Sequence, residues 1–313
     1  MNLWPVQTHA SGKVVLLGEH AVLFGAKALC AALPLGVSVS ACLGTGKIVF
    51  LEQQQSLDWN LLTHSPCFEP RLSDVLTLLQ KMFDLDTSRF DFEISCALPW
   101  AGGLGSSAAI SVAFVRCLNV VYNLHLTTEQ LADVVHRCEQ LFHGRASGID
   151  HQIILQGGVG LFSITQGLVG LNIEPFHVCI GLSGQRKNTA ICVEQVRTQY
   201  MKQPKKTQEL LNAIDHEVSL ATRALLKHDL ITLGQCMNRN HEYLCTLGVS
   251  HERLNQLCAL ALNAGALGAK LTGAGRGGCV IALTTQTQAP HVLSTWNQHG
   301  FEGFITQLGF GNT

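Results

Sequence analysis

The hydrophobic residues of this chain follow two spacings, which predict strands and helices intermixed along the sequence. Short apolar runs that end at glycines or polar turns predict strands, here at residues 13–17, 37–42, 47–51, 90–96, 157–162, 168–173, 178–182, 269–272 and 279–284. Apolar positions at helical spacing predict helices at residues 73–83, 108–122, 207–228, 229–245 and 251–263. The two runs between residues 157 and 173 are expected to pair as a hairpin.

A further helix is predicted after residue 127, where the helical spacing is most regular. Thr127 and Gln130 match a capping box, in which each side chain accepts a hydrogen bond from the backbone of the other residue. Apolar residues at 131, 134, 135, 138, 141 and 142 form one face of the helix. Glu139 lies at the flank of this face, about 80° from Leu131 at roughly 100° per residue. Its carboxylate can reach over the edge of the core, although periodicity alone favours a solvated position.

Length and composition indicate a folded protein with a large core. The chain has 313 residues, and because domains usually contain about 100–200 residues, we expect two, at 1–174 and 175–313. Hydrophobic residues make up 47% and charged residues 14%, which argues against disorder. The formal net charge of -1 provides no basic excess, so neither a nucleic acid nor a membrane is expected as a partner.

The twelve cysteines indicate free thiols rather than a disulfide or metal framework. They include no C-x-x-C pair, and most lie in apolar segments, as expected for a reducing compartment. No basic region followed by an apolar core marks a secretory signal. The uncharged stretch 94–115 is long enough to cross a bilayer, but Pro99 and three glycines interrupt it. We therefore expect a cytoplasmic protein.

Residues 99–109 form a glycine-rich segment between a predicted strand and a predicted helix. The first N–H groups of a helix have no intrahelical partner, and the helix dipole adds partial positive charge there. Because glycines let an anion approach the backbone closely, the segment predicts a phosphate cradle, unless it only packs the helix on a sheet.

Residues 11–25 and 270–279 are glycine-rich as well, and both contain charged residues. Residues 273–278 match G-x-G-x-x-G, but a predicted strand follows and no acidic residue occurs before Glu302, which excludes a dinucleotide site. The sequence also lacks the P-loop, protein-kinase, zincin and G-x-S-x-G motifs. The familiar nucleotide and hydrolase classes are therefore excluded.

These three segments, together with residues 139–150, resemble the GHMP kinases in content and order. Residues 13–20, Lys-x-x-Leu-x-Gly-Glu-His, resemble the mevalonate kinases within that group, as do residues 139–150 and 186–189. The match spans residues 11 to about 283. The resemblance implies an α+β, two-domain GHMP kinase fold: an N-terminal domain like ribosomal protein S5 domain 2, a C-terminal ferredoxin-like α/β sandwich, and an active site in the interdomain cleft.

The resemblance also implies roles for individual residues. Asp150 matches the catalytic aspartate, and Lys13 the lysine beside the substrate hydroxyl. Ser107 and Glu139 match magnesium ligands. The implied binding positions are Glu19, His20 and Thr189 for mevalonate, and Gly102, Gly103, Leu104, Gly105, Ser106, Ser107, Gly273 and Gly275 for ATP. The implied reaction is phosphorylation of the primary hydroxyl of mevalonate by ATP with Mg²⁺, giving 5-phosphomevalonate, and the resemblance is compatible with a homodimer.

General chemistry agrees with these roles, because Mg²⁺ favours hard oxygen ligands such as a hydroxyl and a carboxylate. An aspartate beside a lysine stays ionised and can accept a proton, while the lysine stabilises a developing alkoxide. One alternative is another GHMP kinase, such as a sugar kinase or a phosphomevalonate kinase. The latter needs extra cations, for which Arg145, Arg186 and Lys187 are candidates. A non-catalytic metabolite sensor of the same fold is the other alternative.

Two positions depart from the family pattern. Ala101 and Gly102 stand where the second segment usually has Gly-Ala or Gly-Ser, and Arg276 stands where the third segment usually has glycine. An inward arginine would crowd the close backbone approach that glycines permit. We therefore expect the side chain of Arg276 to point toward solvent.

Overall fold

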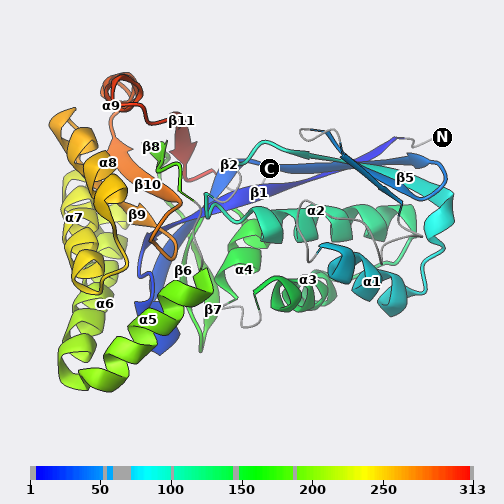
Figure 1. The fold of residues 1–313 in the computed structure, drawn as a ribbon, viewed down its shortest axis with the longest axis horizontal. Coiled ribbons are helices and arrows are strands. Elements are labelled where there is room, and N and C mark those ends of the chain that lie inside the picture. The colour runs from blue at the N-terminus through cyan, green and yellow to red at the C-terminus, as the bar shows by residue number, and fades with distance from the viewer. Residues whose placement is uncertain are drawn as a thin grey trace. The chain divides into compact units, whose positions relative to one another are not determined.

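The computed structural model describes residues 5–51, 55–58, 72–99, 102–143, 148–185 and 189–310 (Figure 1). The chain divides into two compact units, each discontinuous in sequence. The first unit contains Met1–Gly12, Leu35–Leu98 and Gly105–Leu155, and the second contains Lys13–Pro34, Pro99–Leu104 and Gln156–Thr313. Two long strands, β1 (Val6–Leu17) and β2 (Ala28–Leu43), each contribute one part to each unit. The boundary near residue 174 stays a prediction.

Besides its parts of β1 and β2, the first unit contains further strands, some paired antiparallel and some paired parallel. The further strands are β3 (Lys47–Phe50), β4 (Gln55–Asp58) and β5 (Phe90–Cys96). β5 is antiparallel to β2, with Val37 opposite Cys96, and is parallel to β3, which in turn pairs with β4. Alternate residues of β5 are buried, which confirms the alternating pattern predicted for residues 90–96.

The helices of the first unit are α1 (Leu72–Phe83), α2 (Ser106–Val121), α3 (Thr128–His143) and α4 (Ile149–Gln156), with a short 3-10 turn at Thr87–Arg89. Helix α2 is apolar on most sides and lies between the strands and the pair α1 and α3 (Figure 1). Its Phe114 packs on Phe92 of β5, with ring centroids 5.1 Å apart. The predicted capping box of α3 is confirmed: Thr127 and Gln130 exchange hydrogen bonds of 2.9 and 3.2 Å.

The second unit contains the predicted hairpin and an antiparallel sheet. The hairpin strands β6 (Val159–Ser163) and β7 (Gly167–Leu171) pair antiparallel, and β6 also pairs with residues 28–31 of β2. The sheet has the order β11-β8-β10-β9. Its strands are β8 (Phe176–Leu182), β9 (Gly268–Thr272), β10 (Cys279–Thr284) and β11 (Gly303–Leu308).

Helices α5 (Thr189–Lys202), α6 (Pro204–Leu226), α7 (Leu230–Thr246), α8 (Glu252–Asn263) and α9 (Ala289–Gln298) complete the second unit, with a 3-10 turn, η1, at Ala21–Phe24. Helices α7 and α8 pack on β9, and α6 packs on α7 (Figure 1). Trp296 of α9 is fully buried in the core, and its indole N–H donates to the carbonyl of Leu257. Within the described residues, no helix is both long and apolar enough to cross a membrane.

Candidate active site

The first and third glycine-rich segments are joined by hydrogen bonds within the second unit. The hydroxyl of Thr272 in β9 accepts from the N–H of Val15 and donates to its carbonyl, both at 3.0 Å. Two residues earlier, Lys13 is buried, and its backbone N–H donates to the carbonyl of Leu104 at 2.8 Å. Parts of all three segments therefore meet around residues 13–15 of β1, although the segments lie far apart in the sequence.

His20 contacts the third glycine-rich segment directly. Its ring Nε2 lies 2.9 Å from the carbonyl oxygen of Ala274, between Gly273 and Gly275. The backbone of His20 has a φ of 61°, which side-chain-bearing residues seldom adopt, at the residue preceding η1. Backbone strain of this kind persists where surrounding contacts impose it and is enriched at functional sites. The structure thus holds the imidazole of His20 against the predicted phosphate-binding loop.

Glu19 forms a fully buried ion pair with Lys270 of β9. The exposed fractions are 4% for Glu19 and 0% for Lys270, and the ammonium donates to the Glu19 carboxylate and to the carbonyl of Leu271. The amide of Asn240 on α7 donates to the other carboxylate oxygen at 3.5 Å. Burial raises the pKa of Glu19 and lowers the pKa of Lys270, while the opposite charge of each partner counteracts these shifts. No motif in the sequence marks Lys270 as a site residue.

In the third glycine-rich segment, position 275 has no room for a side chain, whereas position 276 has room for that of arginine. A side chain on Gly275 would lie 2.1 Å from the carbonyl oxygen of Val249. Arg276 has a φ of 50°, its side chain is exposed, and its guanidinium donates to Gln195 of α5 at 3.0 Å. The expectation that Arg276 points toward solvent is confirmed.

Thr189, predicted to bind mevalonate, is the first residue of α5 and is partly buried. One turn later on α5, the thiol of Cys192 donates to the carbonyl of Gly275 at 3.5 Å. The start of α5 therefore lies near the third segment. Residues 186–188 and Arg145 lie outside the described residues, as does Ala101.

The second segment enters α2 through glycines. A side chain on Gly102 would lie 3.0 Å from the sulfur of Cys279 and 3.1 Å from the carbonyl oxygen of Pro99, so this position has little room for one. Gly103 and Gly105 have φ values of 77° and 80°. Gly105 is the N-cap of α2, and it has no side chain that could cap the N–H groups of the first turn. These are the groups that bind phosphate at helix N-termini.

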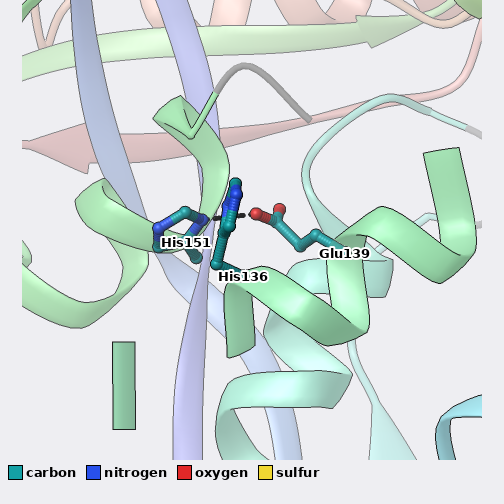
Figure 2. A group of neighbouring side chains, drawn as sticks. All are labelled: His136, Glu139 and His151. Carbon is teal, nitrogen blue, oxygen red and sulfur yellow. Dashed lines mark hydrogen bonds and ion pairs between the residues drawn. The ribbon is translucent and has the colours of Figure 1, made fainter. Parts of the chain in front are cut away.

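The first unit holds the other predicted residues. Ser107 lies in the first turn of α2, and Asp150 lies in the first turn of α4, where the helix dipole favours its ionised form. Glu139 of α3 is 2% exposed, so its carboxylate does reach into the core. It is hydrogen-bonded to Nδ1 of His151 on α4 (Figure 2). His151 is thus a neighbour of the site that the sequence analysis missed.

A third side chain, His136, lies beside this pair one turn before Glu139 on α3 (Figure 2). The rings of His136 and His151 have centroids 5.1 Å apart. Burial is the main cause that lowers the pKa of His136, and the nearby His151 lowers it further. The neutral form of His136 is therefore favoured near neutral pH.

The residues present fit the two cofactors that the sequence implied. Ser107 and Glu139 offer a hydroxyl and a carboxylate, the hard oxygen ligands that Mg²⁺ binds in nucleotide sites. A buried carboxylate such as that of Glu139 also gains from a nearby positive charge, because burial disfavours an isolated anion. The glycine N-cap of α2 leaves N–H donors for an ATP phosphate.

This chain matches the descriptions of two parts of one known protein family, the N-terminal part before the C-terminal part. The descriptions "GHMP kinases N terminal domain" and "GHMP kinases C terminal" match residues 71–158 and 221–302. The mevalonate kinase of Pyrococcus horikoshii is 32% identical over 301 residues, which cover 90% of this chain and 90% of that protein. The mevalonate kinase of Thermococcus sibiricus is 31% identical over 302 residues, which cover 91% and 90%.

A solved structure extends the similarity to three dimensions. L. major mevalonate kinase in complex with R-mevalonate matches with a TM-score of 0.83 at 26% identity, over 97% of this chain and 96% of that chain. The predicted α+β GHMP kinase fold is therefore confirmed. The chain belongs to the GHMP kinase family, and within it to the mevalonate kinases.

Proposed function

We propose that this protein transfers the γ-phosphoryl group of ATP to the primary hydroxyl of mevalonate, giving 5-phosphomevalonate and ADP. The observation that carries this proposal is the similarity to mevalonate kinases over nine tenths of both chains. Lys13, Glu139 and Asp150 are all present at the positions that the family resemblance marks. A metabolite sensor would have no need of all three.

Two residues act on the hydroxyl of the acceptor in this proposal. Asp150 accepts the proton of the primary hydroxyl, and its place in the first turn of α4 favours the ionised form that this requires. The ammonium of Lys13 stabilises the alkoxide as it forms, because opposite charges attract strongly in a partly dehydrated site. Both effects increase as negative charge develops on the attacking oxygen.

Other residues bind and orient the substrate. His20, Glu19 and Thr189 line the mevalonate pocket in this proposal, with His20 held in place by its contact with Ala274. The N–H groups at the start of α2 and the backbone at Gly273 and Gly275 bind the phosphates of ATP. When bound through Ser107 and Glu139, Mg²⁺ neutralises charge on the phosphate oxygens.

The cysteines and the family resemblance bear on the compartment and the oligomeric state of the protein. The described cysteines are free, as in proteins of a reducing compartment, so we expect the enzyme to act in the cytoplasm. A homodimer remains compatible with the family resemblance, and light scattering of the purified chain measures it.

An assay of ADP release across four acceptors tests the substrate. Mevalonate, phosphomevalonate, homoserine and galactose are compared at saturating ATP and Mg²⁺. We expect the highest kcat/KM with mevalonate, because its carboxylate and hydroxyls match the cation and polar groups of Lys13, His20 and Thr189. A higher kcat/KM for galactose or phosphomevalonate would overturn the assignment.

The substitution Asp150→Asn tests the proposed base. The amide keeps the shape of the side chain but cannot accept the proton, so kcat should fall by roughly 10²–10⁴-fold. Calorimetric binding of ATP should be almost unchanged. Asp74→Asn, at an exposed position in the first turn of α1, is the matched control and should keep parental activity. Activity of Asp150→Asn within tenfold of the parent would show that Asp150 is not the base.

A further inference from the structure

His136, Glu139 and His151 form a cluster whose composition differs from that of a magnesium site. His136 and Glu139 are three residues apart on α3, so they share one helix face, and His151 reaches the same place from α4. One ligand atom from each of the three residues lies within 4.8 Å of the other two. Figure 2 shows the imidazole of His136 beside the contact between Glu139 and His151.

The donor set is typical of a transition metal. Two imidazoles and one carboxylate bind Zn²⁺ in proteins, whereas Mg²⁺ takes oxygen ligands almost exclusively. The contact between Nδ1 of His151 and the Glu139 carboxylate shows that both groups already point at a common position. A metal ion can replace the proton that lies between an imidazole and a carboxylate, because it binds the same two lone pairs.

The surroundings of His136 give a second observation. Its Nδ1 is buried with no hydrogen-bond partner among the described residues. Such an atom is destabilising unless an ion or water satisfies it. The other ring nitrogen, Nε2, lies 3.1 Å from the side-chain amide of Gln140. The atom placed at that distance is the amide nitrogen, and rotation of the amide exchanges it with the amide oxygen. With the oxygen accepting the Nε2–H, the lone pair is on Nδ1, the arrangement that orients metal-binding histidines.

We propose that His136, Glu139 and His151 bind a transition-metal ion of the Zn²⁺ class, with water completing the coordination. Zinc ligands lie about 2.0–2.2 Å from the metal, so tetrahedral ligand atoms are separated by about 3.4 Å. The three side chains therefore need to shift by only about an ångström to close on the ion. This site uses the same carboxylate that the proposed function gives to magnesium, so a bound Zn²⁺ withdraws Glu139 from the nucleotide metal and inhibits the kinase.

Calorimetry with Zn²⁺ alone on the metal-free full chain tests the site without any substrate. We expect one Zn²⁺ to bind tightly per chain. His136→Gln and His151→Asn should each weaken that binding by at least about tenfold, since each removes one ligand. Asn at position 151 can still donate to Glu139, which protects the fold. His291→Gln, at an exposed histidine of α9, is the control and should leave the binding unchanged.

Two readouts make the outcome decisive. Bound Co²⁺ should give the intense visible absorption of a four- or five-coordinate ion in the parent chain, and this absorption should be lost in the His136→Gln, His151→Asn double variant. Equal Zn²⁺ affinity in the parent and the double variant, or only six-coordinate Co²⁺ in the parent, would overturn the proposal. The Co²⁺ spectrum of the parent needs no variant, so it decides the matter even if a substitution prevents folding.

A third measurement separates this proposal from the proposed function. Zn²⁺ should inhibit mevalonate phosphorylation with a midpoint that matches its dissociation constant, and His136→Gln should raise that midpoint while keeping activity in zinc-free buffer. A protein that binds Zn²⁺ but phosphorylates no acceptor would contradict the proposed function alone. A protein that phosphorylates mevalonate but fails the calorimetric test would contradict the metal site alone.

Discussion

Each unit buries one glutamate of the predicted site, and the two units partner it differently. In the second unit, Glu19 is bound by the ammonium of Lys270 and the amide of Asn240. In the first unit, Glu139 is bound by the imidazole of His151. An ammonium carries only donors, whereas an imidazole carries a lone pair that a metal ion can use. The pair of Glu19 and Lys270 therefore cannot bind a metal ion, whereas the pair of Glu139 and His151 can.

The difference teaches that burial alone does not define what a glutamate does. Both side chains are almost fully excluded from water, with exposed fractions of 4% and 2%. The partner decides the role: Lys270 makes Glu19 part of a fixed internal ion pair, and the two histidines make Glu139 part of a ligand set. Substitutions that remove one partner at a time test this distinction.

The largest effect is expected where the fixed pair is broken. Lys270→Met keeps the length of the side chain but removes the cation, leaving the Glu19 carboxylate buried without its ammonium partner. The free energy of unfolding should fall by about 3–5 kcal/mol. Urea denaturation measures the change. Adding Glu19→Gln to Lys270→Met should restore much of the loss, and a loss below about 1 kcal/mol in the single variant would show that the pair is not a fixed element.

The pH dependence of stability should also reflect this ion pair, because His241 of α7 lies beside it. Burial, followed by the charge of Lys270, lowers the pKa of His241 to about 4. The unfolded chain then binds a proton below about pH 6.5 that the folded chain does not bind, so the stability of the fold decreases as the pH falls from about 6.5 to 4. The decrease should reach about 3 kcal/mol, at about 1.4 kcal/mol per pH unit.

His241→Asn provides the comparison for this measurement. The Nδ1 of His241 accepts the N–H of Leu271 at 3.3 Å, and the amide oxygen of asparagine can replace this acceptor without titrating. Urea denaturation between pH 7.5 and 4.5 should show a shallower pH dependence in the variant. Identical pH profiles in the two proteins would mean that His241 titrates normally.

An intermediate effect is expected at the pair of Glu139 and His151. Glu139→Gln removes one negative ligand, so the Mg²⁺ concentration for half-maximal rate should rise by roughly tenfold at saturating ATP and mevalonate. Glu129→Gln, at an exposed position in the first turn of the same helix, is the matched control. An unchanged midpoint in Glu139→Gln would remove Glu139 from the magnesium site.

The smallest effect is expected at the surface beside the third glycine-rich segment. Arg276→Gly relieves a φ of 50° but loses the hydrogen bond to Gln195. It also gives the unfolded chain more freedom, so the changes should nearly cancel, within about 1 kcal/mol. The KM for ATP should change by less than about threefold. A tenfold increase with unchanged stability would identify Arg276 as a phosphate ligand.

The sequence predicted the fold best where local patterns decide the structure. The capping box and the alternating strand at 90–96 follow from local chemistry, and both are observed. The predicted strand at 37–42 is in fact the end of β2, because Pro34 and Gly36 interrupt its pattern although the strand continues through them. Similarly, β1 begins at Val6, where polar residues alternate and no apolar run marks a strand.

The predicted site residues lie where family motifs mark them, whereas the partners that the tertiary fold brings to them have no such motif. Helical periodicity left Glu139 between a core edge and a solvated position, and only the packing of α4 on it decides for burial. Lys270 and His151 acquire their importance from partners 251 and 12 residues away. A lysine between the apolar residues of a predicted strand is the one local signal that could have indicated Lys270.

The free thiols give the molecule a set of internal reporters. Of the cysteines that the structure describes, Cys42 is exposed and Cys245 is partly buried, while the other nine are buried. Burial raises the pKa of Cys117 and Cys138 in the first unit to about 12, and that of Cys179 in the second unit to about 11. Alkylating reagents attack the thiolate, so these positions react only when the surrounding structure opens. The rate of alkylation at each cysteine therefore records how often each unit opens on its own.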